Sequence, residues 1–110
     1  MGVIYAGLVG DVGGTNARFS LVDGEGHLRN TKVYLCADYG ALDEIIAEYL
    51  EETAGKKRPA KAVIAVAGPV VDGEIEFTNL DWRVSEIDLI ASFGFDAIKL
   101  INDFAAQAMA

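Results

Sequence analysis

The sequence has 110 residues, 52% of them hydrophobic, which is enough for one compact domain with a single core. Seventeen acidic side chains against nine basic ones give a formal net charge of −8, which argues against nucleic acid or an anionic membrane as a partner. The apolar residues 3–9 are too few to span a bilayer, and one cysteine, Cys36, excludes an intrachain disulfide. We therefore expect a soluble cytoplasmic protein, with Cys36 as a core thiol.

Three antiparallel strands are expected first. Residues 3–9 form an apolar run typical of a buried strand, and a glycine-rich turn follows at residues 10–15. Residues 17–22 alternate between apolar and polar side chains, which predicts a second strand. The Asp-Gly-Glu-Gly segment at residues 23–26 is a hairpin signal, and a third strand is expected near residues 28–35.

Residues 41–52 give the clearest helix prediction. Gly55 is suited to end this helix, because glycine tolerates the left-handed backbone that follows many helices. Five apolar residues fall on one stripe at helical spacing: Leu42, Ile45, Ile46, Tyr49 and Leu50.

The second half predicts a strand at residues 62–67, followed by a hairpin at residues 70–77 that folds around Asp72-Gly73. Ser85 with Asp88 resembles a capping box for a short helix that ends at Gly94.

A last strand is expected at residues 97–101, and Asn102 is placed to cap a final helix. The predicted order is βββαββαβα. Tight turns make the first three strands antiparallel neighbours, and helical crossovers make the later strands parallel additions. We therefore predict a mixed α/β sheet with helices on its faces.

The most informative segment is residues 10–18, Gly-Asp-Val-Gly-Gly-Thr-Asn-Ala-Arg. It is neither a Walker A loop nor a dinucleotide fingerprint, because it lacks the lysine and leads into a strand. Gly13 and Gly14 permit a tight turn with positive φ, whose N–H groups would bind anionic oxygens beside the Thr15 hydroxyl. Asp11 would then hold Mg²⁺, directly or through water. The alternative is a plain hairpin turn.

A second candidate site is Asn102-Asp103, where the last strand gives way to the final helix. A carboxylate at the carboxyl end of a strand in an open α/β sheet points toward the crevice where ligands bind. Asp103 could accept a proton from an attacking hydroxyl, and the amide of Asn102 suits sugar hydroxyls. The alternative is that both residues are ordinary helix caps.

Residues 9–18 resemble the first phosphate motif of the actin-like ATPase superfamily, and their Thr-Asn-Ala-Arg ending is most similar to the bacterial glucokinase family. The resemblance implies a kinase of two lobes, each built on a ribonuclease-H-like sheet. Residues 1–110 would be its N-terminal nucleotide- and sugar-binding lobe, and the C-terminal lobe would lie outside this chain. The residues assigned to the ATP phosphates are Gly10, Asp11, Val12, Gly13, Gly14 and Thr15.

The Ile-Asn-Asp-Phe sequence at residues 101–104 resembles the same family's sugar and catalytic motif. By that resemblance Asp103 is the catalytic base, and Asn102 and Asp103 bind the sugar. Residues 67–70 and 77–82, which contain Asn79 and Trp82, look like the family's hairpin over the sugar side of the cleft.

The function implied by the resemblance is transfer of the γ-phosphoryl group of ATP, with Mg²⁺, to the 6-hydroxyl of glucose. The alternatives are another hexose or amino-sugar kinase, a sugar-sensing repressor, or an actin-like assembly protein. We expect these 110 residues alone to be inactive, because the second phosphate loop and the adenosine site would lie beyond them. Exposed apolar surface, including Phe104 and Met109, predicts a homodimer or a swapped assembly.

Overall fold

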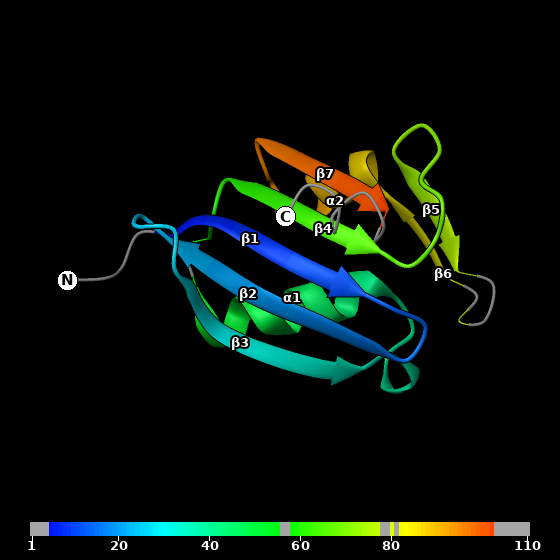
Figure 1. Cartoon of the computed structure of the whole chain (residues 1–110), viewed down its shortest axis with the longest axis horizontal. Helices are drawn as coiled ribbons and strands as arrows, with labels where there is room; N and C mark the ends of the chain where they lie inside the picture. The colour runs from blue at the N-terminus through cyan, green and yellow to red at the C-terminus, as the bar shows by residue number, and fades with distance from the viewer. Residues whose placement is uncertain (1–4, 56–57, 78–79, 81, 103–110) are drawn as a thin grey trace.

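The computed structural model describes residues 5–55, 58–77, 80 and 82–102 (Figure 1). In chain order the elements are β1 (Tyr5–Val12), β2 (Asn16–Asp23), β3 (Leu28–Leu35), a 3-10 turn η1 (Cys36–Asp38), α1 (Leu42–Thr53), β4 (Lys61–Val66), β5 (Glu74–Phe77), β6 (Trp82–Ser85), α2 (Glu86–Phe93) and β7 (Ala97–Asn102).

Five of the described strands form the main sheet, in the order β3-β2-β1-β4-β7. The first three strands pair antiparallel, whereas β4 pairs parallel to β1 and β7 parallel to β4. A helical crossover precedes each parallel strand, since α1 lies before β4 and α2 before β7. The predicted mixed α/β class is confirmed.

Helix α1 packs its predicted apolar stripe against the antiparallel part of the sheet. Leu42, Ile45, Ile46, Tyr49 and Leu50 are all buried. The Tyr49 ring lies 5.8 Å from that of Phe19, and its hydroxyl donates a hydrogen bond to the Asn30 carbonyl at 2.8 Å. The helix ends as predicted, because Gly55 has a φ of 57° and its N–H donates to the Leu50 carbonyl.

Among the described residues, both helices lie on one face of the main sheet (Figure 1). The opposite face, which we call the open face, exposes Val33 by 56% and Val63 by 42%. Parallel strands are usually covered on both faces. The sequence predicted helices on the faces of the sheet, and the helices of the described residues cover one face.

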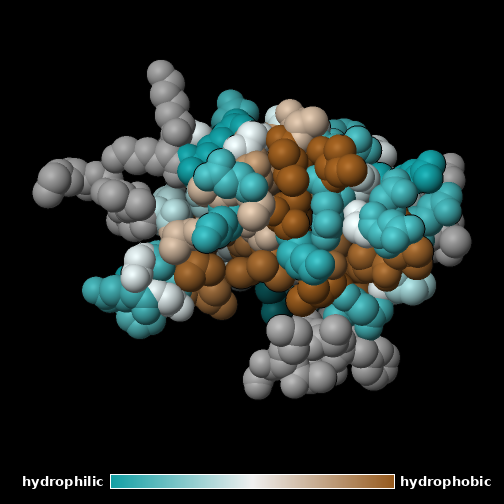
Figure 2. Space-filling model, turned by 90° about the horizontal axis from the view of Figure 1, so that it is seen from above, coloured by the Kyte–Doolittle hydropathy of each residue, from teal (hydrophilic) through white to brown (hydrophobic). Residues whose placement is uncertain are grey.

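Further apolar side chains are exposed near β7 and the β5–β6 hairpin. Val71, Ile87 and Ile90 are 65%, 77% and 38% exposed. The view from above shows hydrophobic side chains gathered beside hydrophilic ones on this side of the molecule (Figure 2).

The predicted hairpin at residues 70–77 is wrong. Asp72 and Gly73 do turn, with φ values of 52° and 73°, but only Val71 and Glu74 pair across them. Pro69 lacks the N–H that would continue a ladder on the incoming side. The strand β5 instead pairs with β6, where Ile75 lies opposite Val84 and Phe77 opposite Trp82.

Ser85 is the N-cap of α2, but its side chain makes no capping hydrogen bond, so the predicted capping box does not form. Ser85 is also the last residue of β6 and is only 8% exposed there, which limits the direction of its hydroxyl. Gly94 ends α2 in the left-handed conformation, as expected. The predicted final helix lies outside the described residues, over which the order is βββαβββαβ.

Candidate functional site

The glycine-rich turn between β1 and β2 is shorter than the sequence suggested and occupies residues 13–15. The Gly13 N–H donates to the Asn16 carbonyl at 2.9 Å and closes the turn. Cys36 holds the turn from below, since its N–H donates to the Thr15 carbonyl at 2.9 Å and its thiol contacts the Gly13 carbonyl at 3.6 Å. Burial raises the pKa of the Cys36 thiol and so keeps its proton available for this contact.

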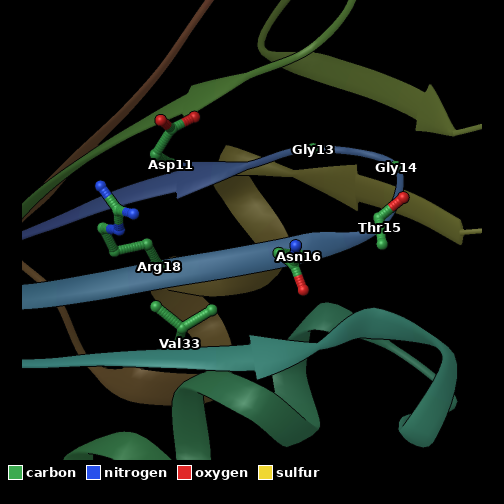
Figure 3. A pocket seen from close by; sticks show the side chains of 7 residues that line it. All are labelled: Asp11, Gly13, Gly14, Thr15, Asn16, Arg18 and Val33. Atoms are coloured by element: carbon green, nitrogen blue, oxygen red, sulfur yellow. The ribbon is translucent and has the colours of Figure 1, made fainter.

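A hollow of about 390 Å³ lies beside this turn (Figure 3). Asp11, Arg18 and Val33 are cross-strand partners on β1, β2 and β3 and therefore project from the same face of the sheet. The full lining is Asp11, Gly13, Gly14, Thr15, Asn16, Arg18 and Val33.

The structure separates the predicted phosphate residues into two groups. Asp11, Gly13, Gly14 and Thr15 line the hollow. Gly10 and Val12 do not, because successive side chains of a strand point to opposite faces. Val12 is fully buried in the core, and a Cβ on Gly10 would lie 2.5 Å from an atom of the Phe19 ring. Gly10 is thus a packing glycine.

The expected backbone of the turn is also different. Neither Gly13 nor Gly14 is among the described glycines with positive φ, so a left-handed conformation does not explain them. A Cβ on Gly13 would meet only the Asn16 carbonyl oxygen, at an ordinary 3.7 Å. Because Gly13 and Gly14 have no side chains, a ligand can approach the backbone of the turn closely.

The charges around the hollow suit an anion with a cation. Arg18 is exposed and takes part in none of the ion pairs found among the described residues. The Asp11 carboxylate is exposed above β1 (Figure 3). No group of three metal-ligating side chains occurs in the described part of the chain. Mg²⁺ fits this arrangement, because it is commonly held by one carboxylate, water and the oxygens of a bound phosphate.

Asn102 lies at the same edge of the sheet as the turn. In register, Val12 pairs with Val66 and Val66 with Asn102, so β1, β4 and β7 end side by side. Two strand spacings separate Asn102 from the start of the turn by about 10 Å. The Asn102 side-chain amide donates to the Gly68 carbonyl, which fixes its orientation. Asp103 and Asn79 lie outside the described residues.

Sequence reasoning missed Arg18 and Val33 as lining residues and Cys36 as a support of the turn. The alternation of residues 17–22 does assign Arg18 to the face opposite Ala17 and Phe19. No local pattern, however, shows which strand lies opposite Arg18 or that a hollow forms there.

A glucokinase family model matches residues 8–110. The chain belongs to the glucokinase family. A glucokinase of Caulobacter vibrioides is 52% identical over 107 residues, which cover 94% of this chain and 32% of that relative. This glucokinase-family chain therefore spans about a third of the length of the curated relatives it matches.

The solved structure of a glucokinase from an Antarctic psychrotroph superimposes with a TM-score of 0.82 at 38% identity, covering 91% of this chain and 33% of that one. The solved structure of a ROK family glucokinase from Streptomyces griseus superimposes with a TM-score of 0.69 at 23% identity, covering 92% of this chain and 34% of that one. The second likeness shows the fold alone.

The family assignment confirms the resemblance on which the expected kinase activity rested. The fold is that of the sugar kinases, with a mixed five-stranded sheet. Within the described residues, no helix combines the length and the apolar character needed to cross a bilayer.

Proposed function

We propose that this chain is the N-terminal lobe of a glucokinase that transfers the γ-phosphoryl group of ATP to the 6-hydroxyl of glucose. The observation that carries the proposal is the shared sheet edge, where the glycine turn and Asn102 lie about 10 Å apart in a glucokinase-family chain. That spacing suits a phosphate chain at one end and a sugar at the other. The Streptomyces griseus relative, which is in complex with glucose and AMPPNP, supports both ligand classes.

At the phosphate end, the Thr15 hydroxyl and the Arg18 guanidinium face the hollow and can donate hydrogen bonds to phosphate oxygens. Asp11 is the residue that would hold Mg²⁺, directly or through water. When bound, Mg²⁺ neutralises phosphate charge. The Gly13 N–H is committed to the Asn16 carbonyl, so it contributes to the shape of the turn rather than to binding.

At the sugar end, Asn102 presents its amide to the sugar hydroxyls, and Asp103 follows it directly in sequence. Asp103 is the general base. It takes the proton of the 6-hydroxyl as that oxygen bonds to the γ-phosphorus and the bond to the leaving ADP oxygen breaks.

Phosphorylation of a sugar panel by the full-length protein tests this function, with Asp103→Asn as the decisive variant. We expect glucose turnover to fall by about 100-fold or more, because a general base is lost, while glucose binding measured by calorimetry stays within a few-fold. Asp88→Asn on the exposed side of α2 is the matched acid-to-amide control and should be fully active.

Each other outcome has a distinct meaning. Turnover retained by Asp103→Asn would remove Asp103 as the base. A preference for another hexose or an amino sugar would change the substrate. No turnover of any sugar would favour an assembly or sugar-sensing protein.

We also propose that residues 1–110 by themselves are inactive, since kinase catalysis needs groups on both sides of a cleft that excludes water. The same coupled assay on the isolated segment tests this, and glucose turnover by the segment would contradict it.

A further inference from the structure

The strand that carries Asn102, β7, is one of the two edge strands of the main sheet in the described part of the chain. Because β4 is the one described strand that pairs with β7, some backbone N–H groups of β7 face outward without a described ladder partner. Leu100, two residues before Asn102, donates its N–H to the carboxylate oxygen Oε2 of Glu86 at 2.8 Å. The Glu86 side chain of α2 thus accepts the hydrogen bond that a neighbouring strand would otherwise accept from Leu100.

Glu86 also contacts the turn that opens the β5–β6 hairpin. Its backbone N–H donates to the Gly73 carbonyl at 2.9 Å. Gly73 lies so close that a Cβ there would be 2.7 Å from the other carboxylate oxygen, Oε1. The Glu86 side chain is therefore packed between the hairpin and β7, and it joins the two-stranded sheet to the five-stranded one.

The far end of the same connection reaches Asn102. The Asn102 amide donates to the Gly68 carbonyl, and Gly68 packs so closely on the hairpin residue Ile75 that a Cβ would lie 3.0 Å from the Ile75 Cδ1 atom. Figure 1 shows the hairpin beside the end of β7. Asn102 is consequently held on two sides, through β7 by Glu86 and through Gly68 by the hairpin.

We propose that Glu86 is a positioning residue for the sugar end of the site. It fixes the outer edge of β7 and the hairpin relative to each other, and so sets the place of Asn102. The inference rests on the proposed glucokinase function, and it makes Glu86 a determinant of sugar affinity that touches no substrate itself.

Two variants of the full-length protein separate this role from a general contribution to helix stability. Glu86→Asp keeps the negative charge at the start of α2 but shortens the side chain by one methylene, so it no longer reaches Leu100. Glu86→Gln loses the charge but keeps an acceptor oxygen at the same length. If Glu86 acts through its charge on the helix dipole, Glu86→Asp keeps that stabilisation of α2 and Glu86→Gln loses it. If Glu86 positions β7, Glu86→Gln keeps the effect and Glu86→Asp loses it.

We expect Glu86→Asp to raise the KM for glucose about tenfold, because a displaced Asn102 would lose a hydrogen bond to the sugar. The KM for Mg-ATP should stay within about twofold, and Glu86→Gln should restore most of the glucose affinity. Asp88→Ala, an exposed acid on the same helix, is the control and should leave both constants unchanged. Hydrogen exchange should accelerate at the Leu100 amide in Glu86→Asp but not in Glu86→Gln.

An unchanged glucose KM in Glu86→Asp, with an active wild type, overturns the inference and leaves the proposed function standing. The inference is equally overturned if Glu86→Gln is the damaging change and Glu86→Asp the harmless one. A wild-type protein that phosphorylates no sugar removes the proposed function and this inference together.

Discussion

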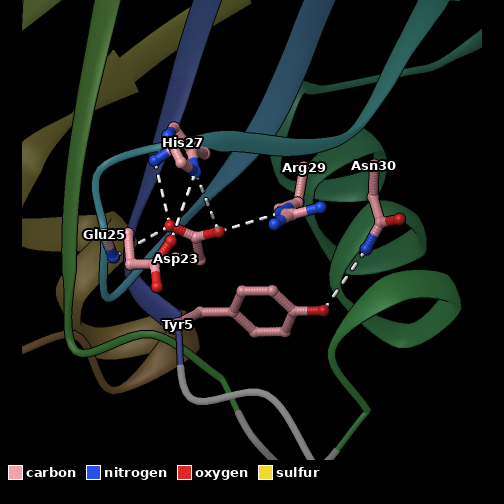
Figure 4. A network of polar contacts seen from close by, with 6 residues as sticks. All are labelled: Tyr5, Asp23, Glu25, His27, Arg29 and Asn30. Atoms are coloured by element: carbon pink, nitrogen blue, oxygen red, sulfur yellow. Dashed lines mark hydrogen bonds and ion pairs between the residues drawn. The ribbon is translucent and has the colours of Figure 1, made fainter.

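Asp23 closes the β2–β3 hairpin through three hydrogen bonds (Figure 4). Its side chain, 8% exposed, accepts from the N–H groups of Glu25 and His27, each at 2.9 Å, and from Arg29 Nε at 2.8 Å. The hydrogen bond from Arg29 is the main cause that lowers the pKa of Asp23 to about 2, and the His27 N–H adds to it. A carboxylate, rather than an amide, is what this turn requires.

The direction of that pKa shift predicts an acid-sensitive hairpin. Because the pKa in the folded state lies below the value of about 3.9 in the unfolded chain, the stabilisation is complete above that value. It is lost as the pH falls toward about 2. Asp23→Asn should therefore lower the Tm at pH 7, and its Tm deficit should shrink between about pH 4 and pH 2.

Thermal unfolding followed by circular dichroism at several pH values measures this deficit. Glu25→Gln, whose side chain is 80% exposed, is the control and should change little. A Tm difference between Asp23→Asn and wild type that does not depend on pH would show that Asp23 acts through its shape alone.

Arg18 lines the hollow beside the glycine turn, on the same face of the sheet as Asp11, and it is the cation that we propose for binding phosphate. In the full-length protein we expect Arg18→Ala to lower kcat/KM for Mg-ATP by about 10- to 100-fold, the effect of losing charge-assisted hydrogen bonds to phosphate. Glucose binding should not change. Arg83→Ala, which removes an exposed arginine on β6, is the control. Steady-state kinetics with each substrate varied in turn gives both constants. An equal loss of kcat/KM in the two variants would contradict a specific role of Arg18.

At the scale of elements, the close pairing of β1 and β2 depends on Gly10. It lies opposite Phe19, and this glycine makes room for the aromatic ring. The ring in turn packs against Tyr49 of α1, so one position joins two strands and a helix.

Gly10→Ala should destabilise the fold by about 1–3 kcal/mol through overpacking, because the new methyl group forces the Phe19 ring to move. Gly7→Ala is the matched control on the same strand, where a Cβ would meet only the Lys61 carbonyl at 3.5 Å. Urea unfolding of the three proteins tests the difference. Equal midpoints for the two variants would contradict the packing role.

The hairpin shows why some elements were predicted incorrectly. Asp72-Gly73 is a strong local turn signal, and the turn does form. What local sequence does not report is which strand finds the better partner. Pro69 limits the incoming arm, and the apolar residues of β6 pair with those of β5 instead.

At the scale of the whole molecule, the open face is the feature that bears on assembly. Val33 and Val63 are exposed there, over a sheet whose other face is covered by the helices. The homodimer expected from the sequence stays a prediction, and we assign its interface to this face in the isolated 110-residue segment. Phe104 and Met109, on which that expectation also relied, lie outside the described residues.

We expect the isolated 110-residue segment to self-associate through this face, because an exposed apolar sheet is a common site of association. Val63→Asp should weaken the dimer by at least about tenfold in Kd. Ile87→Asp, on α2 and 77% exposed in the wild type, is the control and should not weaken it. Analytical ultracentrifugation gives both constants, and a monomeric wild-type segment would refute the expectation.

The sequence by itself determined the elements whose signals are local. Three predictions used only residues a few positions apart: the apolar stripe of α1, the alternation in β2 and the glycine that ends α1. All three are confirmed. The sequence also determined the family, because the motif at residues 9–18 is a contiguous run of residues.

Only the tertiary structure decided which members of that run face the hollow and which pack in the core. Strand register decides that Gly10 packs in the core while Gly13 lines the hollow, and it brings Arg18 and Val33 to the same hollow. The contact of Glu86 with Leu100 likewise joins elements that are distant in sequence. These are cross-strand and edge contacts. Their partners are chosen when the sheet assembles, and no local pattern encodes that choice.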